Sequence, residues 1–513
     1  MKKIKSFFYF MLALFIFGCQ SIAEIKEKDH KITSKPNIVF VIADQLRSHE
    51  LSSYGGVNIQ TPNLDRLAEE GVRMTNAVST YPICSPFRGM LITGLYPLHS
   101  GISNNDHPLN PDLPSFAKAC KEVGYNTAFI GKWHLDGIGR TSYIPPERRL
   151  GYDYWQALEC THDYFNSPYY DNNSKELEFW EGYDAEAQTK SAQSYIENRD
   201  KEKPFFLTLS WGPPHDPYIA PDEYRDKIIA ENLVLRKNIT EHEIVDELQN
   251  NPRFKIPDKF IKSFSGLRKL AKDKQMIKER YAGYLASILA LDDYFGNLMK
   301  TLQKEGILDN TIVVFTSDHG DHLGSHQFYG KNTPFSESIS IPFLLRYPKA
   351  LKAKTVSDAL LSPIDMLPTV LGLANLKHSK VDGIDLSNII KKEQDDTRDA
   401  ILLMNLTHFN GTSLINGLDT YRGIQTKQFT YARYEDKSPW LLYDNLKDPY
   451  QMNNLVGNLS YSKLIKRLDI KLDELLKQAG DPEKTKLIYD RIIKENPKRQ
   501  LLLDLRNTNP NKF

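Results

Sequence analysis

Four short apolar segments end abruptly in residues that bind metals or transfer protons, and this pattern constrains the fold of the 513-residue chain most. The segments, each with the polar residues that follow, are 38–42 with Asp44 and Gln45, 127–130 with Lys132 and His134, 205–209 with His215, and 311–315 with Asp318 and His319. Continuous runs of β-branched and aromatic residues are typical of parallel strands buried on both faces. The carboxyl ends of such strands form the ligand-binding edge of an open α/β sheet. We therefore expect these side chains to line one cleft.

A fifth segment, Cys84-Ser85-Pro86-Phe87-Arg88, places a cysteine at the start of a predicted helix. It lies between a turn at 80–82 and a helix-compatible apolar run at 89–93. Unpaired backbone N–H groups at a helix N-terminus favour an anion there. A lone cysteine beside a helix-starting proline is more commonly a packing residue. Because the acidic strand ends offer it a metal partner, we interpret Cys84 as a modified nucleophile.

Together these motifs resemble the type I sulfatases of the alkaline phosphatase superfamily. Further matching segments are Thr61–Ala68, Thr93–Pro97, Gly131–His134, Ser317–Gly320 and Leu442–Pro449. The matches extend over nearly the whole chain that follows the N-terminal leader. The resemblance implies an α/β fold with a large, mixed and mostly parallel sheet sandwiched by helices. It also implies a smaller C-terminal α+β domain with an antiparallel sheet and a helix.

By this resemblance, Cys84 would be oxidised to Cα-formylglycine (3-oxoalanine) after translation. A sulfatase-maturating, formylglycine-generating enzyme would read Pro86 and Arg88 as its signal. A hydrated aldehyde carries two hydroxyls on one carbon, so that one can attack sulfur and the other can drive release of sulfate. A thiolate cannot do this.

The resemblance also implies a divalent metal held by Asp44, Gln45, Asp318, His319 and the modified Cys84. The family more often has a second Asp at the position of Gln45, whereas His319 is a recognised variant. Both residues reduce the negative charge of the site. Ca²⁺ is the expected ion because most of the ligands are oxygens, with Mn²⁺, Mg²⁺ or zinc as alternatives since one ligand is an imidazole.

The family's sulfate-binding cations match Arg88, Lys132 and Lys331 in this sequence. Fixed cations stabilise the charge that develops as the ester bond breaks. His134 would take the proton of the formylglycine hydroxyl, and His215 would protonate the departing sugar oxygen. Imidazole suits both tasks near neutral pH.

The N-terminus predicts export. Three lysines precede an apolar run at 7–17, a pattern that is typical of a secretory signal peptide, and the run is too short to span a bilayer. Gly18-Cys19 resembles a lipoprotein cleavage site, so we expect a lipid on Cys19, with removal by an ordinary signal peptidase as the alternative. The expected organisation is a signal peptide at 1–18, a tether at 19–35, a catalytic domain at 36–395 and a C-terminal subdomain at 396–513.

The amino-acid composition excludes some classes of function but assigns none. The 66 Lys and Arg nearly balance the 65 Asp and Glu, which is not the charge of a nucleic-acid-binding protein. Cys120 and Cys160 could pair in an oxidising compartment or stay buried and free. His322 and His326 follow the second acidic pair but are expected to be rim or packing residues.

The sequence thus predicts an exported sulfatase, at the periplasm or cell surface, that acts on a carbohydrate. A polysaccharide-derived oligosaccharide, for example from an algal glycan such as ulvan, is the expected substrate. One alternative is a phosphonate monoester or phosphodiester hydrolase of the same superfamily, which Gln45 keeps open. Another is an inactive glycan-binding surface lipoprotein, although a binder has no need of the complete set of Cys84, Arg88, Lys132 and the two histidines. Any membrane contact would be through the lipid anchor.

Overall fold

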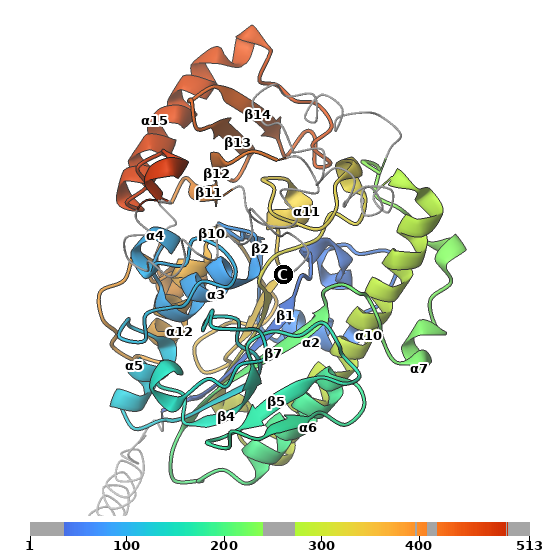
Figure 1. The fold of residues 1–513 in the computed structure, drawn as a ribbon, viewed down its shortest axis with the longest axis vertical. Helices are drawn as coiled ribbons and strands as arrows, with labels where there is room; N and C mark the ends of the chain where they lie inside the picture. The colour runs from blue at the N-terminus through green and yellow to red at the C-terminus, as the bar shows by residue number, and fades with distance from the viewer. Residues whose placement is uncertain (1–34, 240–271, 395–397, 408–417, 489, 491–513) are drawn as a thin grey trace, which may run out of the picture. The chain divides into compact units, whose positions relative to one another are not determined.

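The computed structural model describes residues 35–239, 272–394, 398–407, 418–488 and 490. The described chain from Pro36 onward forms one compact unit that contains two sheets (Figure 1). The predicted signal peptide, most of the tether and Cys19 lie outside the described residues. Within the ranges given, no helix is both long and apolar enough to cross a bilayer.

The larger sheet has ten strands in the order β10-β2-β9-β8-β1-β7-β3-β4-β5-β6. Their bounds are β1 Asn37–Asp44, β2 Val72–Ala77, β3 Asn126–Lys132, β4 Tyr154–Leu158, β5 Pro168–Asp171, β6 Leu177–Phe179, β7 Phe205–Pro214, β8 Thr311–Ser317, β9 Phe343–Arg346 and β10 Thr355–Leu361. The four predicted strands are β1, β3, β7 and β8, and they pair in parallel at the centre of the sheet. Antiparallel pairs involve β9 and the β4-β5-β6 edge. The predicted mixed, mostly parallel sheet is confirmed.

Helices cover both faces of this sheet, which explains the continuous apolar runs. All eight residues of β1 are buried, with Ile38 and Phe40 on one face and Val39 and Val41 on the other. The first face packs against α3 Cys84–Thr93, α5 Phe116–Glu122 and α12 Pro363–Leu373. The second packs against α2 Pro62–Glu70, α6 Asp184–Glu197 and the long α10 Lys274–Lys304 (Figure 1). Burial on both faces favours a continuous apolar run in a central strand, which in β1 extends from Ile38 to Ala43.

The smaller sheet is antiparallel and has the order β11-β12-β13-β14. Its strands are β11 Ile401–Asn405, β12 Tyr421–Gln425, β13 Phe429–Tyr434 and β14 Pro439–Asp444. One face packs on the amphipathic helix α15 Ser462–Gln478 through Leu468, Leu472 and Leu476. The other face packs on Phe328 and Phe335, which belong to the segment between β8 and β9. The predicted C-terminal architecture is confirmed, while the exact domain boundaries stay a prediction.

Candidate active site

The acidic residues meet because β1 and β8 are parallel neighbours in register. Ala43 pairs with Ser317, so the next residues, Asp44 at the end of β1 and Asp318 just after β8, lie level with each other. Gln45 then turns the chain with φ +68, a left-handed conformation that is uncommon outside glycine. Its N–H donates to Asp318 Oδ1 at 2.9 Å. Both carboxylates are completely buried.

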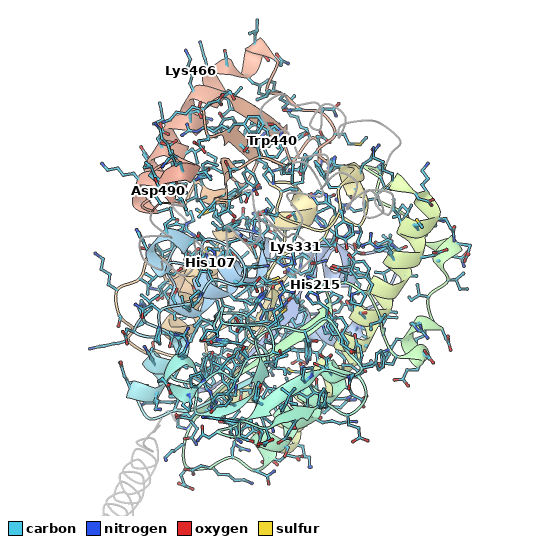
Figure 2. The ribbon with its side chains drawn as sticks, viewed as in Figure 1. His107, His215, Lys331, Trp440, Lys466 and Asp490 are labelled. Carbon is cyan, nitrogen blue, oxygen red and sulfur yellow. The ribbon has the colours of Figure 1, made fainter. Side chains whose placement is uncertain are left out.

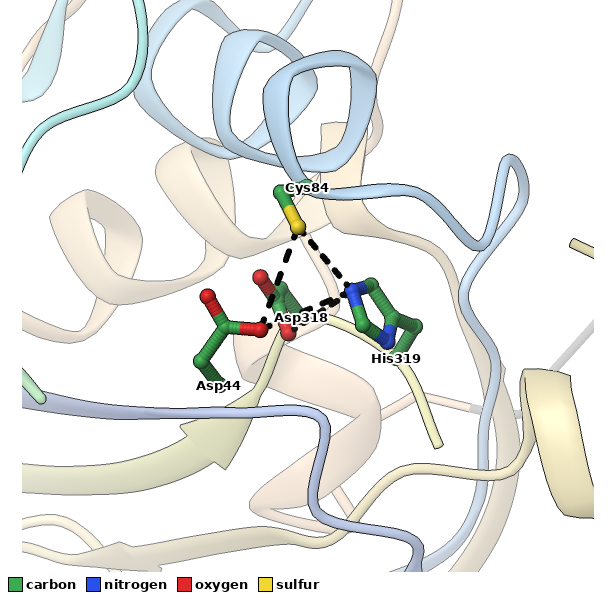
Figure 3. Close-up of side chains that lie close together, drawn as sticks. All are labelled: Asp44, Cys84, Asp318 and His319. Atoms are coloured by element: carbon green, nitrogen blue, oxygen red, sulfur yellow. Dashed lines mark hydrogen bonds and ion pairs between the residues drawn. The ribbon is translucent and has the colours of Figure 1, made fainter. Parts of the chain in front are cut away.

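Cys84 reaches the same place from the first residue of α3, as predicted. Its Sγ lies 3.3 Å from His319 Nε2 and 3.9 Å from Asp44 Oδ1 (Figure 3). His319 Nε2 is in turn 3.4 Å from Asp318 Oδ1 and 3.7 Å from Asp44 Oδ1. One ligand atom from each of these four buried residues lies within 4.8 Å of the other three. We call this set, Asp44, Cys84, Asp318 and His319, the ligand group, because such a cluster of O, N and S donors could hold one divalent ion.

Arg88 and Lys132 balance the two carboxylates. Arg88 follows Cys84 by one helical turn, and its Nη2 lies 3.2 Å from an oxygen of each carboxylate. Its Nη1 donates to the carbonyl oxygen of Lys132 at 2.8 Å and to Ser210 Oγ at 2.7 Å. The Lys132 ammonium, at the end of β3, donates to Asp44 Oδ2 at 2.5 Å and lies 3.9 Å from Cys84 Sγ. Two buried cations therefore face two buried anions.

Lys331 approaches the ligand group from the segment that follows β8. Its Nζ lies 3.2 Å from Cys84 Sγ and donates to Gln45 Oε1 at 2.8 Å. Lys331 and His215 are both buried and lie near the middle of the molecule (Figure 2). The ligand group thus has three cationic side chains around it, Arg88, Lys132 and Lys331.

These cations change the acidity of their neighbours. Burial alone would raise the pKa of the Cys84 thiol, but Lys132, Lys331 and His319 hold it well below its ordinary value. Burial and the Cys84 charge also act to raise the pKa of Asp44, and Lys132, His215 and Arg88 outweigh them, so that the pKa is lowered. The pKa of Asp318 is raised by burial and by Asp44. The site therefore stabilises an anion at position 84.

The two predicted histidines flank Cys84 from separate loops. His134 Nε2 lies 3.2 Å from Asp106 Oδ1, and His215 Nδ1 lies 3.1 Å from Asp216 Oδ1. The His215 ring also stacks on His162, with ring centres 4.4 Å apart and an 18° interplanar angle. Cys84 also acts to raise the pKa of both histidines.

Nearby acids and the sulfur atoms favour the charged form of both imidazoles. Burial lowers the pKa of His134, but Cys160 and Asp106 outweigh it and raise the pKa to about 10. Burial and Lys331 lower the pKa of His215, whereas Asp216 and Asp44 raise it, and the net direction is upward. An uncharged group in place of the Cys84 thiolate would remove the part of each shift that the thiolate causes.

The structure brings the predicted catalytic and metal-binding side chains of the described residues into one site. His322 and His326 are instead buried beside it: His322 bonds to Thr333 Oγ1 at 2.7 Å, and the ring of His326 packs on Phe335. This agrees with the expected packing role, although neither lies at a rim. Cys120 and Cys160 are both free and buried. The alternative of a disulfide between them does not hold in this structure.

Several neighbours of the site were not predicted. Asp106 and His162 contact the two histidines from loops whose sequences carry no periodic pattern, so the sequence offered no signal for them. Asp321 is different, because it belongs to the same polar run after β8 as Asp318 and His319, and that run places it near the site without indicating a role. Its carboxylate accepts from Gln45 Nε2 at 2.5 Å.

Comparison with known proteins agrees with this geometry. A family model described as Sulfatase matches residues 36–376, which is more than half of the chain. The chain belongs to the sulfatase family. A second model, for the C-terminal part of N-sulphoglucosamine sulphohydrolase, matches residues 324–478. This sulfatase is accordingly a sulfuric ester hydrolase.

Individual relatives extend over most of this sulfatase. It is 38% identical over 487 residues to an ulvan-active sulfatase of Formosa agariphila, covering 93% of this chain and 88% of the relative. A solved structure of a protein in complex with its substrate D-glucosamine-2-N,6-O-disulfate has a TM-score of 0.75 and 28% identity, covering 88% of this chain and 100% of the other. The phosphonate monoester hydrolase of Agrobacterium radiobacter has a TM-score of 0.70 at 23% identity, covering 86% and 96%. The last likeness shows the shared fold alone.

Proposed function

We propose that this sulfatase hydrolyses sulfate esters of a polysaccharide-derived oligosaccharide, with ulvan as the first candidate glycan. The observation that carries the proposal is the buried ligand group surrounded by three cations, because it can bind a sulfate and activate a nucleophile at one point. The choice of a glycan is supported by the 38% identical relative named as ulvan-active.

The proposed nucleophile is formylglycine at position 84, made by a sulfatase-maturating enzyme. Cys84, Pro86 and Arg88 are all buried in the folded chain. A modifying enzyme that reads these residues must therefore act before the chain folds. We expect the folded, unmodified protein to resist modification, and the unfolded chain or a peptide spanning the motif to accept it.

The ligand group fits a divalent cation in the modified protein. With an aldehyde hydrate in place of the thiol, the donors would be oxygens from positions 44, 84 and 318 and one imidazole, to which Gln45 Oε1 could add a fifth. This set suits Ca²⁺ first, and Mn²⁺, Mg²⁺ or zinc as alternatives. A bound cation would polarise the sulfate and lower the pKa of the attacking hydroxyl.

The surrounding side chains have distinct proposed roles. Arg88, Lys132 and Lys331 hold the negative sulfate in a site shielded from water, where fixed charges act most strongly. His215, whose pKa is raised, holds a proton for the departing sugar oxygen. His134 is the proposed base for the second hydroxyl at position 84, a role that requires its neutral form, whereas Cys160 and Asp106 raise its pKa to about 10 in the unmodified protein. Asp106 holds the imidazole in place.

Export remains part of the proposal. The N-terminal leader and Cys19 support delivery to the periplasm or cell surface with a lipid anchor, and both lie outside the described residues. Metabolic labelling of cells with a radioactive fatty acid, compared between the wild type and Cys19→Ala, would test the anchor. Absence of label in both would contradict it.

The competing activity is phosphonate monoester or phosphodiester hydrolysis, which Gln45 keeps open because hydrolases of that kind in the same superfamily can share the Asp-Gln and Asp-His pairs. The deciding experiment uses the modified enzyme with sulfated ulvan oligosaccharides, an aryl sulfate and an aryl phosphonate, with Cys84→Ala as the control. We expect sulfate release from at least one oligosaccharide and a higher kcat/KM for the aryl sulfate than for the phosphonate. A preference for the phosphonate, or no sulfate release from any of a panel of sulfated glycans, would reject the proposal.

A further inference from the structure

The side chain of Gln45 has two ends of opposite hydrogen-bonding character, and its neighbours accept only one orientation. Its Nε2 donates to Asp321 Oδ2 at 2.5 Å, while its Oε1 accepts from Lys331 Nζ at 2.8 Å. An ionised carboxylate only accepts, and an ammonium only donates. Turning the amide by 180° would place a donor against Lys331 and an acceptor against Asp321. The present orientation is therefore the one that satisfies both partners.

Asp321 is itself held firmly. Its Oδ1 accepts from the backbone N–H of Leu323 at 2.9 Å, and its Oδ2 also accepts from the hydroxyl of Tyr218. The Tyr218 hydroxyl receives a hydrogen bond from Arg280 Nη2 at 3.2 Å. Asp321 is fully buried and Tyr218 is nearly so, so water cannot replace these donors easily. Tyr218 and Leu323, from the segments after β7 and β8, thus donate to one carboxylate, and Arg280 of α10 donates to Tyr218.

The oxygen end of Gln45 shares a hydrogen-bond partner, Lys331, with Cys84 of the ligand group. Lys331 Nζ, to which this oxygen bonds, lies 3.2 Å from Cys84 Sγ. The Gln45 backbone is fixed as well, because its carbonyl oxygen accepts from Tyr284 and its N–H donates to Asp318. Only rotation of the side chain would remain free, and Asp321 removes that freedom.

We propose that Asp321, supported by Tyr218, is a positioning residue that turns the Gln45 carbonyl oxygen toward a divalent cation in the ligand group. The inference rests on the proposed function, because it needs that cation. It also explains how a neutral amide can serve where the family more often has a carboxylate. The carboxylate of Asp321 polarises the amide from its far end and restores negative charge one hydrogen bond away.

Asp321→Asn tests the proposal because asparagine cannot reproduce the carboxylate. If the oxygen of the new side-chain amide faces Gln45, its NH₂ group faces the N–H of Leu323, and two donors meet without an acceptor. If its NH₂ faces Gln45, the Gln45 amide must turn and present its own NH₂ to Lys331 and the cation. Either arrangement weakens cation binding. We expect the Kd for Ca²⁺ to rise by about 10- to 100-fold, the usual effect of changing a residue that orients a metal ligand.

A double-mutant cycle separates this role from a general structural one. Calorimetric titration of chelator-treated protein with Ca²⁺, and then Mn²⁺, would compare the wild type, Asp321→Asn, Gln45→Ala and the double variant. Because Asp321 acts through Gln45, adding Asp321→Asn to Gln45→Ala should change the Kd less than about twofold. Asp292→Asn is the matched control: it alters another buried carboxylate, which accepts from the N–H groups of Asn63 and Leu64, and should leave the Kd unchanged.

Each outcome is informative. Wild-type protein that binds neither cation overturns Ca²⁺ and Mn²⁺ as the metal of the proposed function, and this inference with them. Binding by the wild type with an unchanged Kd in Asp321→Asn overturns the inference alone, as does an equal loss in the presence and absence of Gln45. If Asp321→Asn does not fold, Tyr218→Phe keeps the carboxylate and removes one of its donors. It should raise the Kd about three- to tenfold, and only when Gln45 is present.

Discussion

Replacing Arg88 by methionine would leave the two carboxylates of the site without their shared counter-ion. Methionine keeps much of the side-chain volume, so that the change is mainly one of charge and hydrogen bonding. The guanidinium lies 3.2 Å from both Asp44 and Asp318 and also donates to Ser210 Oγ and the Lys132 carbonyl oxygen. In the variant, Lys132 would still contact Asp44, while Asp318 would lose its contact with the guanidinium.

The size of the effect follows from these distances. At an effective dielectric constant of about 20, each contact at 3.2 Å amounts to about 5 kcal/mol of attraction. The cost of burying the guanidinium offsets much of this sum, but removing one partner leaves the other charges buried and uncompensated. Such changes typically cost about 3–5 kcal/mol. We expect this loss in the free energy of unfolding without metal, and about half of it with saturating Ca²⁺, which would supply positive charge at the same point.

Urea denaturation followed by tryptophan fluorescence, with a chelator and with Ca²⁺, would measure both values. Arg433→Met is the matched control. Arg433 is also buried and contacts three carboxylates, Asp469, Asp473 and Glu483, but in the C-terminal part of the chain. Its loss should not depend on Ca²⁺. A loss below about 1 kcal/mol for Arg88→Met, or one that Ca²⁺ leaves unchanged, would refute this account of the charge balance.

Three further predictions concern catalysis, the metal and pH. His215→Ala should lower kcat/KM on a sulfated sugar by about 10²–10⁴-fold, with a smaller loss on an activated aryl sulfate, whose leaving oxygen needs no proton. His134→Ala should lower kcat/KM on both substrates. Equal losses for both variants on both substrates would show that the two roles are wrongly divided. Chelation should inactivate the enzyme, and Asp44→Ala should lower both metal content and rate, so that elemental analysis finding no metal in active enzyme would contradict the site. Burial raises the pKa of Asp184 from 3.8 to about 7, so its contribution to stability is present at low pH and is lost as the pH rises from about 4 to about 7. Asp184→Asn should therefore gain roughly 2–3 kcal/mol relative to the wild type between pH 5 and pH 8 in urea denaturation, and a pH-independent difference would speak against a neutral carboxyl.

The central sheet could be predicted from the sequence because the apolar segments of its strands fit only a sheet that is covered on both faces. From Ile38 to Ala43, β1 is apolar, and a strand with no polar face must be covered on both sides. The place of the site followed from the same pattern, since β1, β3, β7 and β8 all end in reactive residues. The helix that begins at Cys84 was predictable from Pro86 and the apolar run after it.

The contacts that refine the site could not be predicted in this way. The stacking of His162 on His215 depends on how two loops fold over the sheet edge, which no local pattern encodes. The pairing of Asp106 with His134 joins positions 28 residues apart in irregular chain. The orientation of Gln45 depends on Asp321 and Lys331, both more than 270 residues away. Sequence periodicity reports burial, whereas these contacts depend on the register and paths of distant segments.

The central claim is that position 84 carries the nucleophile as formylglycine. Its most direct test is mass spectrometry of the peptide that contains residue 84. The peptide would come from several preparations of enzyme produced together with a sulfatase-maturating enzyme, and the specific activity of each preparation on a sulfate ester would be measured. We predict that the fraction of peptide carrying the aldehyde rises in proportion to specific activity, and that Cys84→Ala shows neither. Full activity from protein whose Cys84 remains an unmodified thiol would contradict the account.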